Sequence, residues 1–220
     1  MAIAVVFDLD GTLIDSRGTI VTACNHALEW AGHVALPADV IAGFVGDGAR
    51  NLMTRALGAD ALPADVDAAL VEFLRYYEAH PVAGTTWMPA ARETLDALAD
   101  HPLALVTNKA RGVALLVLEA LGVVSRFASI VAGGDGPLKP DPAPIRRAIS
   151  AMRATAEHTW VVGDGVQDVL AGRAAGCKTA AVSGGFTSES KLRSAGPDVF
   201  LQSVAELLPL LELSAGSKTT

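Results

Sequence analysis

The sequence predicts an α/β fold in which a mostly parallel sheet is flanked by helices and interrupted by a helical insertion. Two observations lead to this prediction. Over most of the chain, short apolar runs alternate with helical patterns, as they do where helical crossovers join parallel strands. Between residues 16 and 85 this alternation stops, and four helical patterns follow one another without a convincing strand.

Five strands are expected, because five short runs rich in β-branched residues are bounded by turn residues. These runs are residues 2–7, 103–107, 130–132, 160–162 and 179–182. Helical patterns at residues 90–99, 112–121 and 142–152 lie between the later runs. The strands and helices therefore follow one another as in a sheet covered on both faces.

The insertion is expected to contain four helices, with glycine and proline residues between them. The helical patterns cover residues 19–31, 37–44, 49–57 and 64–80. The predicted division of the chain is an α/β core of residues 1–15 and 86–213, a helical insertion of residues 16–85, and a flexible polar tail of residues 214–220.

Composition excludes several classes of protein. Of the 220 residues, 51% are hydrophobic and 19% are charged, which is typical of a folded domain and not of a disordered chain. The net charge is -7 and basic residues form no run, so no nucleic-acid partner is expected. Glu119 ends the most apolar stretch, residues 113–118, too early for a membrane span.

The N-terminal segment and the cysteines indicate where the protein works. The segment before Asp8 has no basic leader, and the two cysteines have neither disulfide-framework nor metal-ligand spacing. We therefore expect a cytoplasmic protein, either a monomer or a homodimer.

The strongest chemical signal is the motif FDLDGTL, in which a buried strand ends in Asp8 and Asp10. Side chains two residues apart on a strand point to the same side, here at the edge of the sheet where parallel folds bind ligands. Two buried anions repel unless a cation or a proton separates them. Gly11 and Thr12 allow and stabilise a tight turn that follows the strand.

Two further strand ends supply donors and a cation. A second strand, LALVTNK, ends in Thr107, Asn108 and Lys109, although a threonine and an asparagine in this place more often cap a helix. In the segment PLKPDP, three prolines hold Lys139 on a stiff loop. A cation positioned in this way suits a phosphate group.

A second pair of acids, Asp164 and Asp168, lies in the segment WVVGDGVQD, after the strand 160–162. Acids at the start of a helix are also favoured by the helix dipole, so this pair alone is weak evidence. Together with the other strand ends, the pair completes a set of carboxylates, a hydroxyl and a lysine. Such a set suits Mg²⁺ and a phosphoryl group.

In order, these four motifs resemble those of the haloacid dehalogenase superfamily of phosphotransferases. The likeness covers essentially the whole chain and implies a Rossmann-like core with an α-helical cap, formed here by residues 16–85. Within the cap, the segments GFVGDGARNLMTRALG and YYEAHPVAGTTWMP resemble the phosphoglycolate phosphatase branch. The resemblance therefore implies a small phosphomonoester as the substrate, and 2-phosphoglycolate is the one we expect.

The resemblance also assigns roles to the residues. It implies that Asp8 is the nucleophile and that Asp10 is the general acid and base. Thr107, Asn108 and Lys139 would bind the substrate. Mg²⁺ would be held by Asp8, the Asp10 backbone carbonyl and Asp164, with Asp168 acting directly or through water. Gly165 departs from the family, which often has serine there.

A second cation is expected for the carboxylate of phosphoglycolate, because Lys139 is committed to the phosphoryl group. Arg50 is the candidate, since it follows the turn at residues 46–48 and begins a cap helix. The alternative is that Arg50 is a solvated helix residue, in which case Arg17, Lys109 or Arg55 would take its place.

Other readings of the same motifs remain. An amino-sugar 6-phosphate phosphatase or a phosphosugar mutase would use the same chemistry. A phospho-accepting signalling module is disfavoured by the helical insertion after the first strand. Dehalogenation is disfavoured by Asp10, which supplies the acid and base that is typical of the phosphatases.

Overall fold

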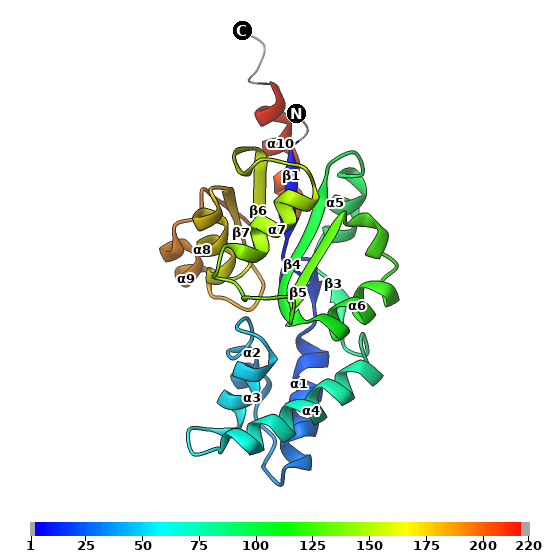
Figure 1. The fold of residues 1–220 in the computed structure, drawn as a ribbon, viewed down its shortest axis with the longest axis vertical. Coiled ribbons are helices and arrows are strands. Elements are labelled where there is room, and N and C mark those ends of the chain that lie inside the picture. The colour runs from blue at the N-terminus through cyan, green and yellow to red at the C-terminus, as the bar shows by residue number, and fades with distance from the viewer. Residues whose placement is uncertain (1–2, 217–220) are drawn as a thin grey trace.

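Residues 3–216, which the computed structural model describes, contain one parallel sheet of six strands. The strand order is β5-β4-β1-β6-β7-β8, which places β1 inside the sheet between β4 and β6 (Figure 1). The bounds are β1 (Ala4–Phe7), β4 (Leu103–Ala110), β5 (Ser129–Gly133), β6 (Thr159–Gly163), β7 (Lys178–Val182) and β8 (Val199–Leu201). The fold class predicted from the sequence is confirmed.

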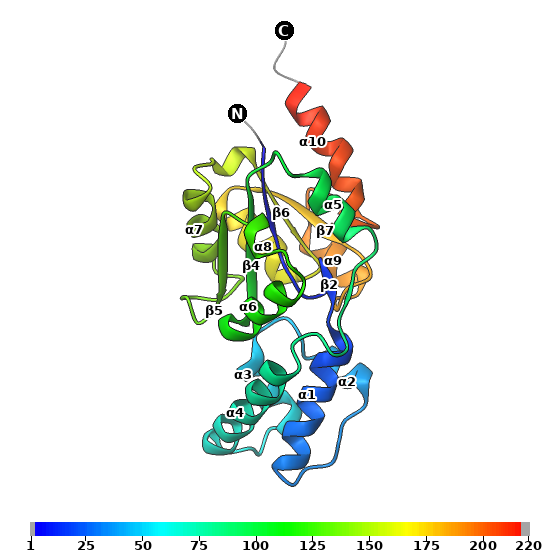
Figure 2. The same cartoon turned by 90° about the vertical axis from the view of Figure 1, so that its right-hand side faces the viewer.

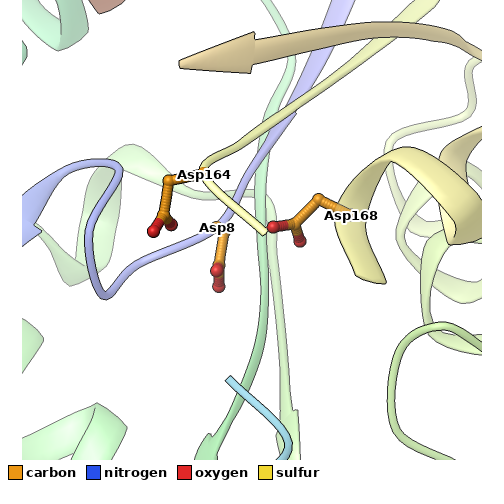
Figure 3. Close-up of side chains that lie close together, drawn as sticks. All are labelled: Asp8, Asp164 and Asp168. Atoms are coloured by element: carbon orange, nitrogen blue, oxygen red, sulfur yellow. The ribbon is translucent and has the colours of Figure 1, made fainter. Parts of the chain in front are cut away.

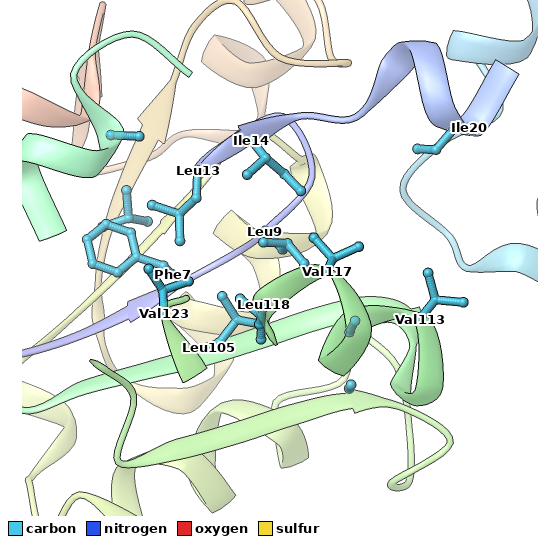
Figure 4. Packing of buried hydrophobic residues seen from close by; sticks show 14 of the residues in the cluster. Phe7, Leu9, Leu13, Ile14, Ile20, Leu105, Val113, Val117, Leu118 and Val123 are labelled. Atoms are coloured by element: carbon cyan, nitrogen blue, oxygen red, sulfur yellow. The ribbon is translucent and has the colours of Figure 1, made fainter. Parts of the chain in front are cut away.

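Helices cover both faces of the sheet, and the alternation of side chains along β1 determines which helix each residue meets. Val5 and Phe7 pack in the cluster that includes residues of α5 (Ala91–Ala97) and α6 (Arg111–Ala120), as the close-up in Figure 4 shows for Phe7. Ala4 and Val6 pack on the opposite face against α7 (Ala143–Ala151) and α8 (Val166–Ala175). Figure 2 shows α7 and α5 on opposite sides of the sheet.

Four helices form the cap, below the sheet in Figure 1. They are α1 (Arg17–Trp30), α2 (Ala38–Ala42), α3 (Ala49–Leu57) and α4 (Pro63–Ala79). The two long helices, α1 and α4, pack together through small residues that are fully buried. These are Ala23 and Ala27 of α1 and Ala69 of α4. The cap core belongs to the same apolar cluster as one face of the sheet.

A short antiparallel ribbon carries both crossings between the core and the cap. Its strands, β2 (Ile14–Asp15) and β3 (Thr86–Trp87), pair Ile14 with Trp87 and Asp15 with Thr86. Asp15 ends β2 and Thr86 begins β3, next to the ends of the predicted helical insertion, whose division from the core stays a prediction. Two-residue strands are too short to show a hydrophobic period, so neither strand was predicted.

The C-terminal part of the chain has more regular structure than expected. The strand β8 and the helix α9 (Glu189–Ala195) were not predicted. The helix α10 (Leu207–Gly216) continues into the tail that was predicted from residue 214, and the flexibility of that tail stays a prediction. Residues 217–220 lie outside the described part of the chain. No helix within residues 3–216 is long and apolar enough to cross a membrane.

Candidate active site

The carboxyl ends of three neighbouring strands bring the predicted residues to one edge of the sheet. Asp8 follows β1, Thr107 lies in the second half of β4, and Asp164 follows β6. Because β1 pairs in parallel with both β4 and β6, all three residues reach the edge that faces the cap.

Three buried carboxylates form a cluster at this edge. Asp8, Asp164 and Asp168 each offer one oxygen atom, and these atoms lie within 4.8 Å of one another. Figure 3 shows Asp8 between the other two. Asp8 Oδ1 is buried, and the group of the described residues that it meets is the ammonium group of Lys139 at 2.9 Å. Three buried carboxylates so close together fit a hard cation such as Mg²⁺.

Lys139 neutralises part of this charge. Its ammonium nitrogen Nζ lies 2.9 Å from Asp8 Oδ1 and donates to Asp168 Oδ1 at 2.6 Å and to the Val106 carbonyl at 2.7 Å. Only 1% of the Lys139 side chain is exposed. The carboxylates of Asp8 and Asp168 thus hold the ammonium group in place, and its predicted contact with a phosphate stays a prediction.

The Asn108 side chain holds Lys139 and the cap loop in place. It accepts a hydrogen bond from the Lys139 backbone N–H at 2.9 Å and donates to the Lys139 carbonyl at 2.9 Å. The same amide donates to the Gly46 carbonyl of the cap at 2.8 Å, and Gln167 donates to that carbonyl at 3.4 Å. The side chain predicted to bind substrate is therefore engaged with backbone groups.

Asp164 is fixed from two sides. Thr12 Oγ1 donates to one of its oxygens at 3.0 Å, and the Phe186 backbone N–H donates to the other at 2.7 Å. Gly11 has a φ of +83°, and a Cβ atom there would come within 2.3 Å of an Asp164 oxygen. This position therefore requires glycine for its conformation and for the close approach.

Asp168 stands at the start of α8 and has both oxygens engaged. One accepts from Lys139, and the other accepts from the Gly165 backbone N–H at 3.0 Å. Asp168 therefore has two structural roles. It caps the N-terminus of α8 through Gly165, and it pairs with Lys139. Its predicted contribution to a metal site stays a prediction.

Asp10 is not part of the carboxylate cluster and meets a second lysine. Lys109 Nζ donates to its two oxygens at 3.0 and 3.1 Å, and Ser16 Oγ donates at 2.6 Å. Lys109 also donates to the Tyr77 hydroxyl of the cap at 2.8 Å. The sequence analysis offered Lys109 as a donor at a strand end and as one replacement for Arg50, and its pairing with Asp10 was not predicted.

A cavity lies between the strand ends and the cap, with about 660 Å³ of empty space that is partly open to solvent. Its core side includes Asp8, Asp10, Thr107 and Asp164. Its cap side is mostly apolar and is formed by Ile20, Val45, Ala49, Leu52, Phe73 and Leu74. A small ligand in this cavity would therefore be held between polar groups of the core and an apolar wall.

Comparison with known proteins decides the family. The model of the haloacid dehalogenase-like hydrolases matches residues 5–182. The chain belongs to this family. It is 36% identical to a phosphoglycolate phosphatase of Chromobacterium violaceum over 95% of this chain and 96% of the relative. It is 37% identical to a plasmid-encoded phosphoglycolate phosphatase of Cupriavidus necator over 94% of this chain and 92% of the relative.

Solved structures agree with this assignment. The crystal structure of a predicted phosphoglycolate phosphatase from Haemophilus somnus has a TM-score of 0.88 and 26% identity, covering 94% of this chain and 96% of the other. The resemblance inferred from the motifs is thus confirmed, and the chain is a haloacid dehalogenase-like phosphomonoester hydrolase.

In this hydrolase, Arg50 is not brought to the cavity. It forms an ion pair with Asp67 of α4, and 56% of its side chain is exposed. Ala49 and Leu52 line the cavity instead, because residues three apart share one face of a helix and Arg50 lies on another. The structure therefore corrects the expectation that Arg50 faces the core site.

Burial raises the pKa values of two carboxyl groups in this hydrolase. The pKa of Asp8 rises to about 7 because burial and the nearby Asp168 outweigh the attraction of Lys139. The pKa of Asp164 rises to about 8 through burial and the charges of Asp8 and Asp168. Burial lowers the pKa of Lys139, but Asp168 and Asp8 raise it more, so that the lysine stays charged.

These shifts predict that Mg²⁺ stabilises the protein more at high pH. A carboxyl group whose pKa is higher in the folded state than in the unfolded state destabilises the metal-free fold as the pH rises. The loss begins near the ordinary pKa of about 4 and is complete above the folded-state values of about 7 for Asp8 and about 8 for Asp164. A divalent cation relieves this repulsion and binds only the ionised groups. The rise in melting temperature on adding Mg²⁺ should be larger at about pH 8.5 than at about pH 5.5. Equal rises at both values would contradict this account.

Proposed function

We propose that this enzyme hydrolyses 2-phosphoglycolate to glycolate and inorganic phosphate, with Mg²⁺ and through an aspartyl phosphate on Asp8. The observation that supports the chemistry is Asp8 itself, a buried carboxylate that lies on the cavity wall beside Lys139 and two further acids. The choice of substrate is supported by the names of the relatives, which align with nearly the whole chain.

In the first step, an oxygen of Asp8 attacks phosphorus, and the bond from phosphorus to the leaving oxygen breaks. Asp10, which lines the same cavity, gives a proton to that oxygen and releases glycolate. In the second step, water attacks the phosphorus of the aspartyl phosphate while Asp10 takes its proton. Asp8 is regenerated and phosphate leaves.

Lys139 and Thr107 are proposed to hold the phosphoryl oxygens during both steps. Thr107 is buried beside the cavity, and its hydroxyl oxygen accepts from the Lys109 backbone N–H at 3.2 Å, which leaves its own proton available to donate. Asp8 and Asp164 would hold Mg²⁺, with the Asp10 carbonyl and Asp168 assisting. When bound, the ion offsets the repulsion between the Asp8 carboxylate and the phosphate.

A phosphate-release screen over small phosphomonoesters tests the substrate. We expect kcat/KM for 2-phosphoglycolate to exceed that for glucosamine 6-phosphate, glucose 6-phosphate and glycerol phosphate by at least about tenfold, because the apolar cap wall leaves sugar hydroxyls without partners. A sugar phosphate turned over faster than phosphoglycolate would contradict the proposal. It would favour the alternative sugar-phosphate reading.

A further inference from the structure

Lys109 is the one cation among the described residues that line the cavity. It lies at the end of β4, and only 7% of its side chain is exposed. Its ammonium group has two partners with different origins, Asp10 of the core and the Tyr77 hydroxyl of the cap. Burying the charged group of a lysine costs free energy. If Lys109 served only to neutralise Asp10, its side chain would not need to lie on the cavity wall.

The position of Lys109 matches the geometry of an acidic leaving group. Asp10 must come within hydrogen-bonding distance of the leaving oxygen in order to protonate it. In phosphoglycolate, the carboxylate carbon is only two covalent bonds from that oxygen, roughly 2.5 Å away. Because Lys109 Nζ lies 3.0 and 3.1 Å from the two Asp10 oxygens, the carboxylate of such a substrate comes within its reach.

Tyr77 supplies a second polar group at the same place. It projects from α4 of the cap, is 1% exposed, and lines the cavity beside Lys109. A phenolic hydroxyl can accept from the ammonium group and donate to a carboxylate at the same time. The neighbouring cap residues Phe73 and Leu74 are apolar. Tyr77 is therefore the residue of α4 whose side chain can form a hydrogen bond with the carboxylate of phosphoglycolate.

We propose that Lys109 and Tyr77 form the subsite that binds the carboxylate of the substrate and selects acidic phosphomonoesters over neutral ones. The proposal rests on the proposed function and identifies the residues that recognise its substrate. In this role Lys109 shares its charge between Asp10 and the substrate, and Tyr77 contributes only when the cap lies against the core.

The test compares 2-phosphoglycolate with 2-phosphoglycolamide, in which a neutral amide of nearly the same shape replaces the carboxylate. The wild-type enzyme should prefer the acid. Lys109→Met keeps the length of the side chain and removes its charge, and it should reduce the ratio of the two kcat/KM values by about 10- to 100-fold. Tyr77→Phe, which leaves Lys109 and Asp10 in place, should reduce the same ratio by about three- to tenfold.

Lys191→Met is the matched control, since Lys191 is an exposed lysine on α9 and does not line the cavity. It should leave the ratio unchanged. Melting temperatures show whether each variant is folded. If Lys109→Met does not fold, Tyr77→Phe still tests the subsite. Equal losses on both esters in both variants would overturn the subsite, because Lys109 would then act only through Asp10.

The two proposals fail in different ways. If the wild-type enzyme releases no phosphate from phosphoglycolate, the proposed function is wrong whatever the variants do. If it turns over phosphoglycolate well and the ratio stays at the wild-type value in both variants, only the carboxylate subsite is wrong.

Discussion

Asp8→Asn should reduce kcat/KM for phosphoglycolate by about 10⁴-fold or more, the largest effect expected for any single substitution in this enzyme. The amide has the shape of the carboxylate but lacks a nucleophilic anionic oxygen. The substitution also leaves Lys139 paired with Asp168, so the loss should not come from unfolding.

Rapid acid quenching with phosphorus-labelled substrate measures this directly. Label should accumulate on the wild-type protein and be absent from Asp8→Asn. Asp10→Asn is the matched comparison, because it removes the proton donor and keeps the nucleophile. It should still become labelled, although slowly. Stoichiometric label on Asp8→Asn protein would refute the assignment of Asp8.

Removal of divalent metal should lower activity by about 10³-fold or more, and added Mg²⁺ should restore it. The reason is electrostatic, since three buried carboxylates and a phosphate dianion meet where Lys139 is the one cation within contact of Asp8 in the described residues. Phosphate release is measured after exhaustive chelation and then across a Mg²⁺ titration.

Asp164→Asn provides the control for specific binding. It removes one charge from the cluster but keeps the hydrogen-bonding shape, so the Mg²⁺ concentration for half-maximal activity should rise by about tenfold or more. Full activity in demetallated wild-type protein would exclude the proposed role of the ion.

The core of the site could be predicted because it depends on strand ends. Asp8 and Asp164 follow apolar runs that the sequence shows clearly, and parallel pairing of β1 with β6 then brings the two together. Lys139 was recognisable from the prolines around it. Each of these inferences needs only local sequence and one topological rule.

The remaining parts depend on contacts that no local pattern reveals. The pairing of Lys109 with Asp10 joins residues 99 positions apart, and the contact with Tyr77 depends on how the cap lies against the core. Arg50 shows the opposite error. The helix start at Ala49 was predicted correctly, but the face that turns toward the cavity is decided by packing of α3 against α4.

The inner position of β1 has a consequence for how the enzyme forms on the ribosome. This strand is made first, yet its two neighbours in the sheet begin only at Leu103 and Thr159. The ribosome adds about 5–20 residues per second, so several seconds pass between the synthesis of β1 and that of either neighbouring strand. All four cap helices are synthesised in this interval. Nascent chains that end before Thr159 hold a finished cap and half a sheet. Translation must therefore pass Asp168 before the predicted set of site residues is complete.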